Sequence, residues 1–92
     1  MREHKTMKIR YSKASLKFLS KLDKKSVMRI REAINMLTLD PPKGDIKVMQ
    51  GYSDGRKRLR VGSWRIIYRY DTDGKVEVLD VLEIGNRGDI YK

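Results

Sequence analysis

The stretch that decides the fold is Leu59-Arg60-Val61-Gly62-Ser63-Trp64-Arg65-Ile66-Ile67-Tyr68. Apolar residues and arginines alternate on either side of Gly62-Ser63. This pattern is typical of two strands joined by a two-residue hairpin turn. Outward from this turn, Val61 is expected opposite Trp64, and the pairing continues to Arg56 opposite Arg69. Side chains alternate between the two faces of a sheet. One face therefore carries Leu59, Val61, Trp64, Ile66 and Tyr68. The other carries five arginines, Arg56, Arg58, Arg60, Arg65 and Arg69, with only Ile67 among them.

Two short helices are expected before this hairpin. Ser12 and Asp23 are suitable N-caps, because their side-chain oxygens can accept a free backbone N–H of the first helical turn. The first helix is expected to end near Leu22, and the second before Asp40-Pro41-Pro42, because proline cannot donate to the helical ladder. Apolar residues at helical spacing are expected to face the core, namely Leu16, Phe18, Leu19, Leu22, Val27, Ile30, Ile34 and Leu37.

Strand patterns surround these elements. Residues 7–11 alternate with period two, and residues 76–84 are nearly continuous apolar, as expected for a central strand. Thr72-Asp73-Gly74 suits a turn between the last two strands, and residues 46–49 suggest a short extended piece. The order βαα then βββ predicts an α+β fold, with two N-terminal helices packed on one face of a small, about four-stranded antiparallel sheet.

Composition restricts the chemistry. The chain has 92 residues, no cysteine and a single histidine, so disulfides, a cysteine nucleophile and a thiolate or all-histidine metal site are excluded. We expect no metal and no other cofactor. Residues 1–6 are expected to be a disordered lead and residues 7–92 a single domain. No apolar run is long enough to span a bilayer, so no membrane role is expected. A reducing, cytoplasmic setting fits this composition.

Charge points to an anionic partner. The formal net charge is +10, and residues 56–70 carry six basic side chains and no acidic one. Such a field attracts nucleic acid or an acidic protein. Like charges directly opposed on a sheet are destabilising, and the planar fork of arginine suits phosphate. The basic face therefore favours a polyanionic ligand over a merely solvated sheet surface.

The hairpin is followed by Val81-Leu82-Glu83-Ile84-Gly85-Asn86-Arg87-Gly88-Asp89-Ile90-Tyr91. Together the two segments resemble the RelE/ParE toxin superfamily of bacteria and archaea, and the likeness covers residues 7–92. The resemblance implies a RelE-like microbial RNase fold and a toxin of a type II toxin–antitoxin system. RelE-like members cleave mRNA codons in the ribosomal A site, whereas ParE-like members inhibit DNA gyrase.

The resemblance to the RelE-like branch implies catalytic roles for Arg58, Arg65, Arg87 and Tyr91. The other basic residues expected to bind RNA are Arg56, Lys57, Arg60 and Arg69, although strand parity directs Lys57 to the opposite face. In the reaction that the resemblance implies, the 2′-OH attacks the adjacent phosphate while the protein positions the strand and stabilises charge. Because the site has no acidic pairs or ligand histidines, a metal-independent endoribonuclease is expected. The general base stays open, because arginine has a pKa above about 12.

The implied partners are a cognate antitoxin protein, the ribosome and mRNA. Two alternatives remain open: a ParE-type inhibitor of DNA gyrase, and a non-catalytic RNA-binding module. Among the other polar and aromatic residues, Trp64 is expected to pack in the core. Asp80 and Glu83 are expected to be structural or solvent-facing, and they could also balance nearby arginines.

Overall fold

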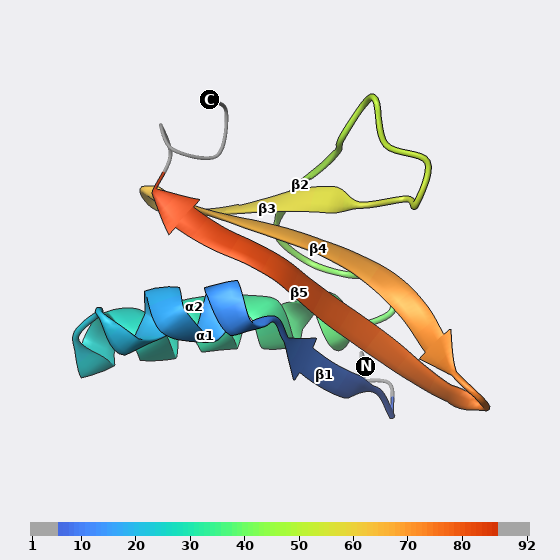
Figure 1. Ribbon diagram of the computed structural model, residues 1–92, viewed down its shortest axis with the longest axis horizontal. Helices are drawn as coiled ribbons and strands as arrows, with labels where there is room; N and C mark the ends of the chain where they lie inside the picture. Colours follow the sequence, from blue (N-terminus) through green and yellow to red (C-terminus); the bar gives the residue numbers. More distant parts are fainter. Residues whose placement is uncertain (1–5, 87–92) are drawn as a thin grey trace.

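A five-stranded mixed sheet carries two helices on one of its faces (Figure 1). The computed structural model describes residues 6–86. Its elements follow the order β1 (Lys8–Tyr11), α1 (Lys13–Ser20), α2 (Lys24–Asn35), the 3₁₀ turn η1 (Met36–Thr38), β2 (Asp45–Val48), β3 (Lys57–Val61), β4 (Trp64–Asp73) and β5 (Val76–Asn86). The strand order is β1-β5-β4-β3-β2. The predicted α+β class is confirmed, but the sheet has five strands and is not wholly antiparallel.

The exception to antiparallel pairing is β1, which runs parallel to β5 with Tyr11 opposite Val81. The backbone N–H of Ser12 donates to Val81 O at 3.0 Å, and its Oγ donates to Leu82 O at 2.7 Å. The end of β1 is thus tied to β5 at the residue where α1 begins. A hairpin turn forces its two strands to be antiparallel. Two helices separate β1 from the next strand, so no turn sets its direction, and the expectation of an antiparallel β1 was wrong.

The register of the β3–β4 hairpin agrees with the predicted one. Five pairs, from Val61 opposite Trp64 to Lys57 opposite Tyr68, are as expected. Gly62 has φ +57°, the left-handed region that the first position of such a turn requires. The next turn falls slightly later than predicted, at residues 74–75, because β4 continues through Asp73.

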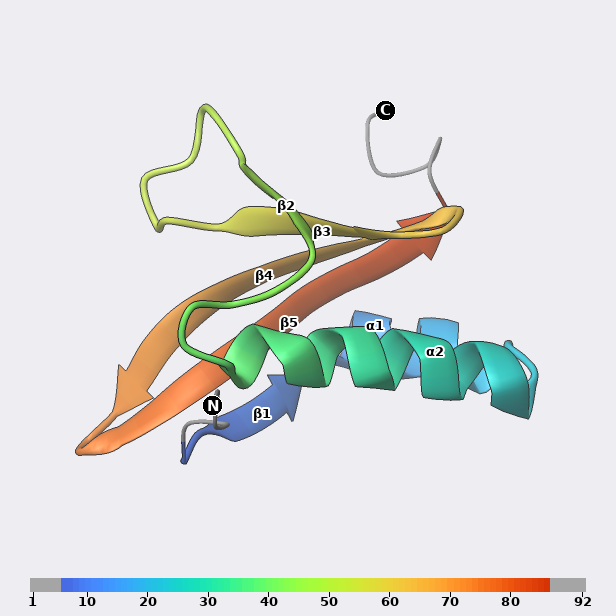
Figure 2. The ribbon, with the colours of Figure 1, turned by 180° about the vertical axis from the view of Figure 1, so that it is seen from behind.

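Both helices lie on the same side of the sheet, where α1 packs against β5 and α2 against β3 (Figures 1 and 2). Both predicted N-caps are confirmed, since Ser12 accepts from Ser15 N and Asp23 accepts from Ser26 N. The core between helices and sheet consists of Leu19, Ile30, Ile34, Leu37, Leu59, Ile66, Tyr68, Leu79, Val81 and Ile84. Among the described residues no helix is both long and apolar enough to cross a membrane.

One predicted core residue is wrong. Leu16 is 54% exposed, whereas its neighbour Ser15 is fully buried. The Ser15 hydroxyl donates to Val81 O at 3.3 Å, so the small polar side chain allows α1 to approach β5 closely. α1 is only eight residues long, and the side that faces the sheet is centred on Ser15 and Leu19 rather than on Leu16.

Candidate nucleic-acid interface

The sheet face opposite the helices carries the arginines of the hairpin. We call it the arginine face and define it by Arg58 and Arg60 of β3 and Arg65 and Arg69 of β4. Arg60 pairs with Arg65, and Arg58 pairs with Ile67. The residues that alternate with them along both strands belong to the core. The alternation therefore places these four arginines on one surface, as the sequence pattern indicates.

The two central arginines are largely buried. Arg58 exposes 8% and Arg65 exposes 7% of its surface. Asp45, on the neighbouring strand β2, accepts a hydrogen bond from Arg58 Nη2 at 3.3 Å. Ile67, next to Arg58 in the register, is also buried. The centre of the arginine face is thus closely packed, and its two central side chains are largely shielded from solvent.

Asp54, in the connection between β2 and β3, binds two arginines at once. Its Oδ2 lies 2.8 Å from Arg56 Nη2 and 2.9 Å from Arg69 Nη1, and its Oδ1 accepts from Arg56 Nε at 3.1 Å. The hydrogen bond from Arg56, helped by Arg69, holds the pKa of the Asp54 carboxyl far below its usual range. Arg56 and Arg69, predicted to oppose one another, are instead bridged by a carboxylate, which removes the expected repulsion.

Asp80 of β5 extends this network toward β1. Its carboxylate accepts from Arg10 Nε at 2.7 Å and from Arg10 Nη2 at 3.0 Å, and it lies 3.6 Å from Arg69 Nε. Hydrogen bonding to Arg10 is the main cause that lowers the pKa of Asp80. Charges of alternating sign therefore cross the sheet from the β2–β3 connection to β1, in the order Arg56, Asp54, Arg69, Asp80, Arg10. The expectation that Asp80 balances nearby arginines is confirmed.

Some predicted site residues lie apart from the arginine face. Lys57 is on the helix side of the sheet, where its Nζ lies 5.5 Å from the centre of the Tyr70 ring. Lys57 therefore lies apart from the arginines, on the face that strand parity indicated, and its contact with RNA stays a prediction. Trp64 packs against the core with Arg29 over its ring at 5.5 Å, as expected of a core residue. Arg87 and Tyr91 lie outside the described residues.

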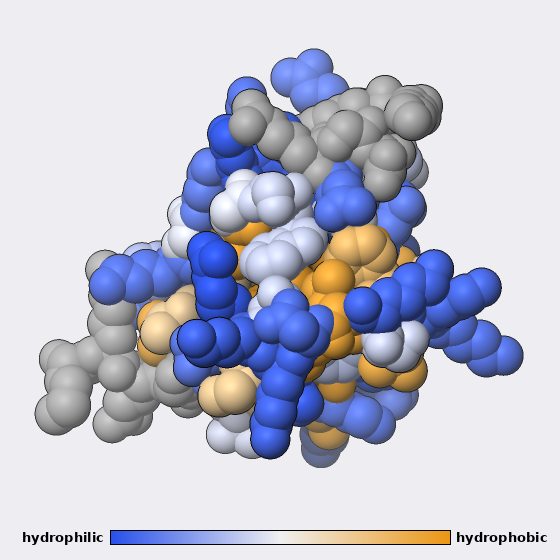
Figure 3. Space-filling view, turned by 90° about the vertical axis from the view of Figure 1, so that its left-hand side faces the viewer, coloured by the Kyte–Doolittle hydropathy of each residue, from blue (hydrophilic) through white to orange (hydrophobic). Residues whose placement is uncertain are grey.

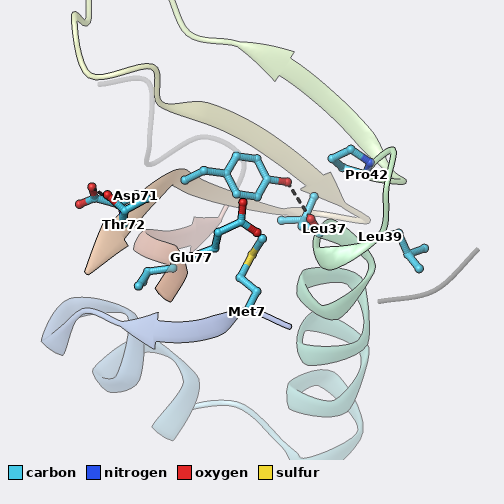
Figure 4. Close-up of a pocket in the computed structure, with 9 residues that line it drawn as sticks. Met7, Leu37, Leu39, Pro42, Asp71, Thr72 and Glu77 are labelled. Atoms are coloured by element: carbon cyan, nitrogen blue, oxygen red, sulfur yellow. Dashed lines mark hydrogen bonds between the residues drawn. The ribbon is translucent and has the colours of Figure 1, made fainter. Parts of the chain in front are cut away.

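The pocket drawn in Figure 4 is also away from the arginine face. It is a cavity of about 490 Å³ beside the end of α2. Figure 4 shows Met7 and Glu77 reaching into it, and the dashed line marks the 2.7 Å hydrogen bond from Tyr70 to Leu37 O. None of the arginines described above lines it. The guanidinium cluster is therefore a surface feature of the sheet and not part of this cavity.

Hydrophilic side chains dominate another side of the molecule, where α1 and α2 connect. Figure 3 shows them projecting around a narrower band of hydrophobic surface. The outward positions of the helices include seven basic residues: Lys13, Lys17, Lys21, Lys24, Lys25, Arg29 and Arg31. Positive charge is thus not confined to the arginine face.

Sequence reasoning missed the acidic and aromatic partners of the arginines. Asp54 precedes Gly55 in a connection for which the sequence predicts no regular structure, and Asp45 lies just before the piece predicted to be extended. Tyr52, whose ring centre is 4.1 Å from the guanidinium carbon of Arg56, lies in the same connection. No local pattern identifies these contacts, because they form only when the connection folds beside β4. Among the described residues, no group of three or more His, Asp or Glu side chains is arranged to hold a metal ion.

Comparison with known proteins defines the class. Residues 9–91 match the family model described as the ParE toxin of type II toxin–antitoxin system, parDE. The chain belongs to this family. It is a type II toxin with a RelE-like structure, and the resemblance to the RelE/ParE superfamily is confirmed.

Two solved structures are similar over most of their length. One is the archaeal RelE–RelB complex from Pyrococcus horikoshii OT3, with 28% identity and a TM-score of 0.69, covering 92% of this chain and 99% of that one. The other is the RelB–RelE antitoxin–toxin complex from Methanococcus jannaschii, with 27% identity and a TM-score of 0.54, covering 88% and 93%. No curated protein sequence matches the chain.

Proposed function

We propose that this toxin is a ribosome-dependent endoribonuclease that cleaves mRNA codons in the A site, within the cytoplasm. The observation that carries the proposal is the gathering of Arg58, Arg60, Arg65 and Arg69 on one sheet face. The likeness to two RelE structures supports it. A closely packed set of guanidiniums suits a phosphodiester, because each planar fork can donate two parallel hydrogen bonds to phosphate oxygens.

In the proposed reaction the 2′-OH of one nucleotide attacks the adjacent phosphorus. The 5′-oxygen of the next nucleotide leaves, which gives a 2′,3′-cyclic phosphate and a 5′-OH. Arg58 and Arg65 stabilise the charge that builds on the phosphorane, and their burial fixes them before the reaction. Arg87 has the same proposed role, and Tyr91 stacks on a base, a contact of about 1–3 kcal/mol. The proposal assigns no general base, because an arginine side chain is poorly suited to that role.

The proposed partners of the toxin are the ribosome, mRNA and a cognate antitoxin. The two similar structures are both complexes with an antitoxin. The basic surface of this chain fits an acidic segment of such a protein. A segment that folds upon binding can cover a large part of a small toxin.

A second candidate is inhibition of DNA gyrase, which the match to the ParE family model favours. The two candidates predict different products. A nuclease leaves cuts inside codons of translated mRNA, whereas a gyrase inhibitor leaves mRNA intact and blocks supercoiling.

The test is primer extension on mRNA translated in a purified system with added toxin. We compare the wild type with Arg65→Gln, and with Lys24→Gln as a control that removes one positive charge from the exposed start of α2. Loss of one donor of this kind reduces catalysis by about 10²–10³-fold. Circular dichroism checks that both variants fold, and Arg65→Lys tests whether charge without the planar fork suffices. Supercoiling by gyrase is measured in parallel. Intact mRNA together with blocked supercoiling would establish the second candidate instead.

A further inference from the structure

The carboxylate of Asp54 occupies a position that suits a phosphate. Two guanidiniums, from Arg56 and Arg69, converge on it, and three of their N···O distances lie between 2.8 and 3.1 Å. Convergence of two arginines on one pair of oxygens is the arrangement by which proteins hold phosphates. The Asp54 side chain is 25% exposed, so solvent and ligands reach the site.

Each of the two arginines has a second partner that does not depend on Asp54. The Arg56 guanidinium lies over the Tyr52 ring at 4.1 Å, a contact that is favourable for a cation on an aromatic face. Arg69 Nε lies 3.6 Å from Asp80, which Arg10 fixes through two hydrogen bonds. Each guanidinium therefore retains an interaction partner when the Asp54 carboxylate leaves.

The segment that carries Asp54 is suited to moving. It connects β2 to β3, and Figure 1 shows the connection projecting from the edge of the sheet, away from the helices. Gly51 has φ +87° and Gly55 has φ +75°, and neither has an atom near the position that a Cβ would occupy. Because glycine tolerates backbone conformations that other residues resist, Gly55 can absorb a rotation of residues 53–54 that moves the Asp54 carboxylate while Tyr52 stays over Arg56.

We propose that Asp54 is an internal substitute for an RNA phosphate. It occupies a phosphate subsite formed by Arg56 and Arg69, and a phosphodiester of the RNA displaces it. This inference rests on the proposed RNA-binding function and adds its regulation: the free protein masks part of its own binding surface. The unusual consequence is that removal of Asp54 tightens RNA binding by more than the change in net charge explains.

The experiment measures binding of a fluorescent single-stranded oligoribonucleotide by anisotropy at several salt concentrations. The full-length wild type is compared with Asp54→Asn and with Glu32→Gln. The control makes the same charge change on the exposed side of α2. Displacement of exposed ion pairs predicts that Asp54→Asn binds about three- to tenfold more tightly than Glu32→Gln. Asp54→Ser gives the same gain, and circular dichroism verifies the fold of every variant.

A double-mutant cycle tests whether the gain in RNA affinity arises at the subsite formed by Arg56 and Arg69. In an Arg69→Gln background the gain from Asp54→Asn shrinks, because one of the two arginines of the subsite is already lost. An unchanged gain in that background overturns the proposal.

The results separate the two hypotheses. Equal affinities for Asp54→Asn and Glu32→Gln would refute the masking by Asp54, while RNA binding and cleavage by the wild type would leave the proposed function standing. Absence of RNA binding in every variant overturns the masking by Asp54, whereas absence of cleavage in the ribosomal assay overturns the proposed function. A fluorescent poly-glutamate peptide is tested in parallel. If Asp54→Asn tightens binding of the peptide but not of RNA, the site receives protein carboxylates and the proposal is wrong.

Discussion

Asp80→Asn tests whether the charge network across the sheet stabilises the fold. The Asp80 side chain is only 10% exposed, and it accepts two hydrogen bonds from Arg10, at 2.7 and 3.0 Å. Asparagine preserves its shape and removes its charge and one acceptor. The substitution therefore leaves Arg10 and Arg69 beside a neutral group.

The expected loss follows from the exposure of the partners. An exposed ion pair contributes about 0.2–1 kcal/mol, and a buried hydrogen bond to a charged group about 1.5–3 kcal/mol. The Arg10 side chain is 42% exposed, so water rehydrates it in part, and a loss of about 1.5 kcal/mol is expected. For a domain of this size, each kcal/mol changes Tm by about 4–8 °C. Asp80→Asn should therefore lower Tm by about 6–12 °C.

The assay is thermal unfolding followed by circular dichroism, with Asp71→Asn as the matched control. Asp71 lies 3.8 Å from Arg10, and both side chains are more than 40% exposed, at 42% and 45%. Its loss should cost less than about 0.5 kcal/mol. Because both variants remove one negative charge, the difference between them isolates the buried pair.

The dependence of stability on pH gives a second measurement of the Asp80 contribution. The pKa of Asp80 is lowered in the folded state, so its contribution is fully present above the ordinary carboxyl pKa of about 4. The contribution disappears as the pH falls through the lowered pKa of the folded state. The difference between wild type and Asp80→Asn should be constant from about pH 5 to 8 and close at lower pH. Equal melting temperatures for Asp80→Asn and Asp71→Asn, or a difference that persists in strong acid, would refute this account.

Two further predictions concern hydroxyl groups. The Tyr68 hydroxyl is buried and has no hydrogen-bond partner among the described residues, so Tyr68→Phe should leave stability to urea unchanged or raise it by up to about 1 kcal/mol. Tyr70→Phe loses the hydrogen bond to Leu37 O and should lower the free energy of unfolding by about 1 kcal/mol. If Tyr68→Phe proved less stable than Tyr70→Phe, the argument would be contradicted. Ser12→Ala removes both the cap of α1 and the bond to Leu82 O, and should cost about 1–2 kcal/mol in the same urea titration. A loss below about 0.3 kcal/mol would show that Ser12 does not fix the start of α1.

Local patterns were sufficient where a short-range constraint acts. The Gly62-Ser63 turn sets the hairpin register, because a two-residue loop with a positive φ at its first position leaves one alignment of the strands. The alternation of side chains along each strand then determines on which face of the sheet every other residue of the hairpin lies. The caps at Ser12 and Asp23 were equally predictable, since a cap binds a backbone N–H three residues away.

Contacts between distant residues were not predictable in this way. Arg10 and Asp80 are 70 positions apart, and Asp54 and Arg69 are 15 apart across a connection without regular structure. The absence of acidic residues from positions 56–70 indicated an uncompensated basic face. The compensating carboxylates come from β2, β5 and the β2–β3 connection, whose positions depend on the assembled sheet. The same limit explains why the direction of β1 was missed.

This compensation separates two electrostatic roles within one small protein. On and beside the arginine face, eight basic side chains (Lys8, Arg10, Lys47, Arg56, Arg58, Arg60, Arg65 and Arg69) meet six carboxylates (Asp45, Asp54, Asp71, Asp73, Asp80 and Glu83). Residues 12–36, which contain the two helices, instead carry seven basic and two acidic side chains. The helical segment therefore carries about half of the net charge of +10, whereas the sheet offers oriented donors of lower net charge. Net charge governs the rate of encounter and its dependence on salt, so substitutions on the helices should change mainly the association rate. Oriented donors govern how a phosphate is held, so substitutions on the sheet should change mainly the dissociation rate.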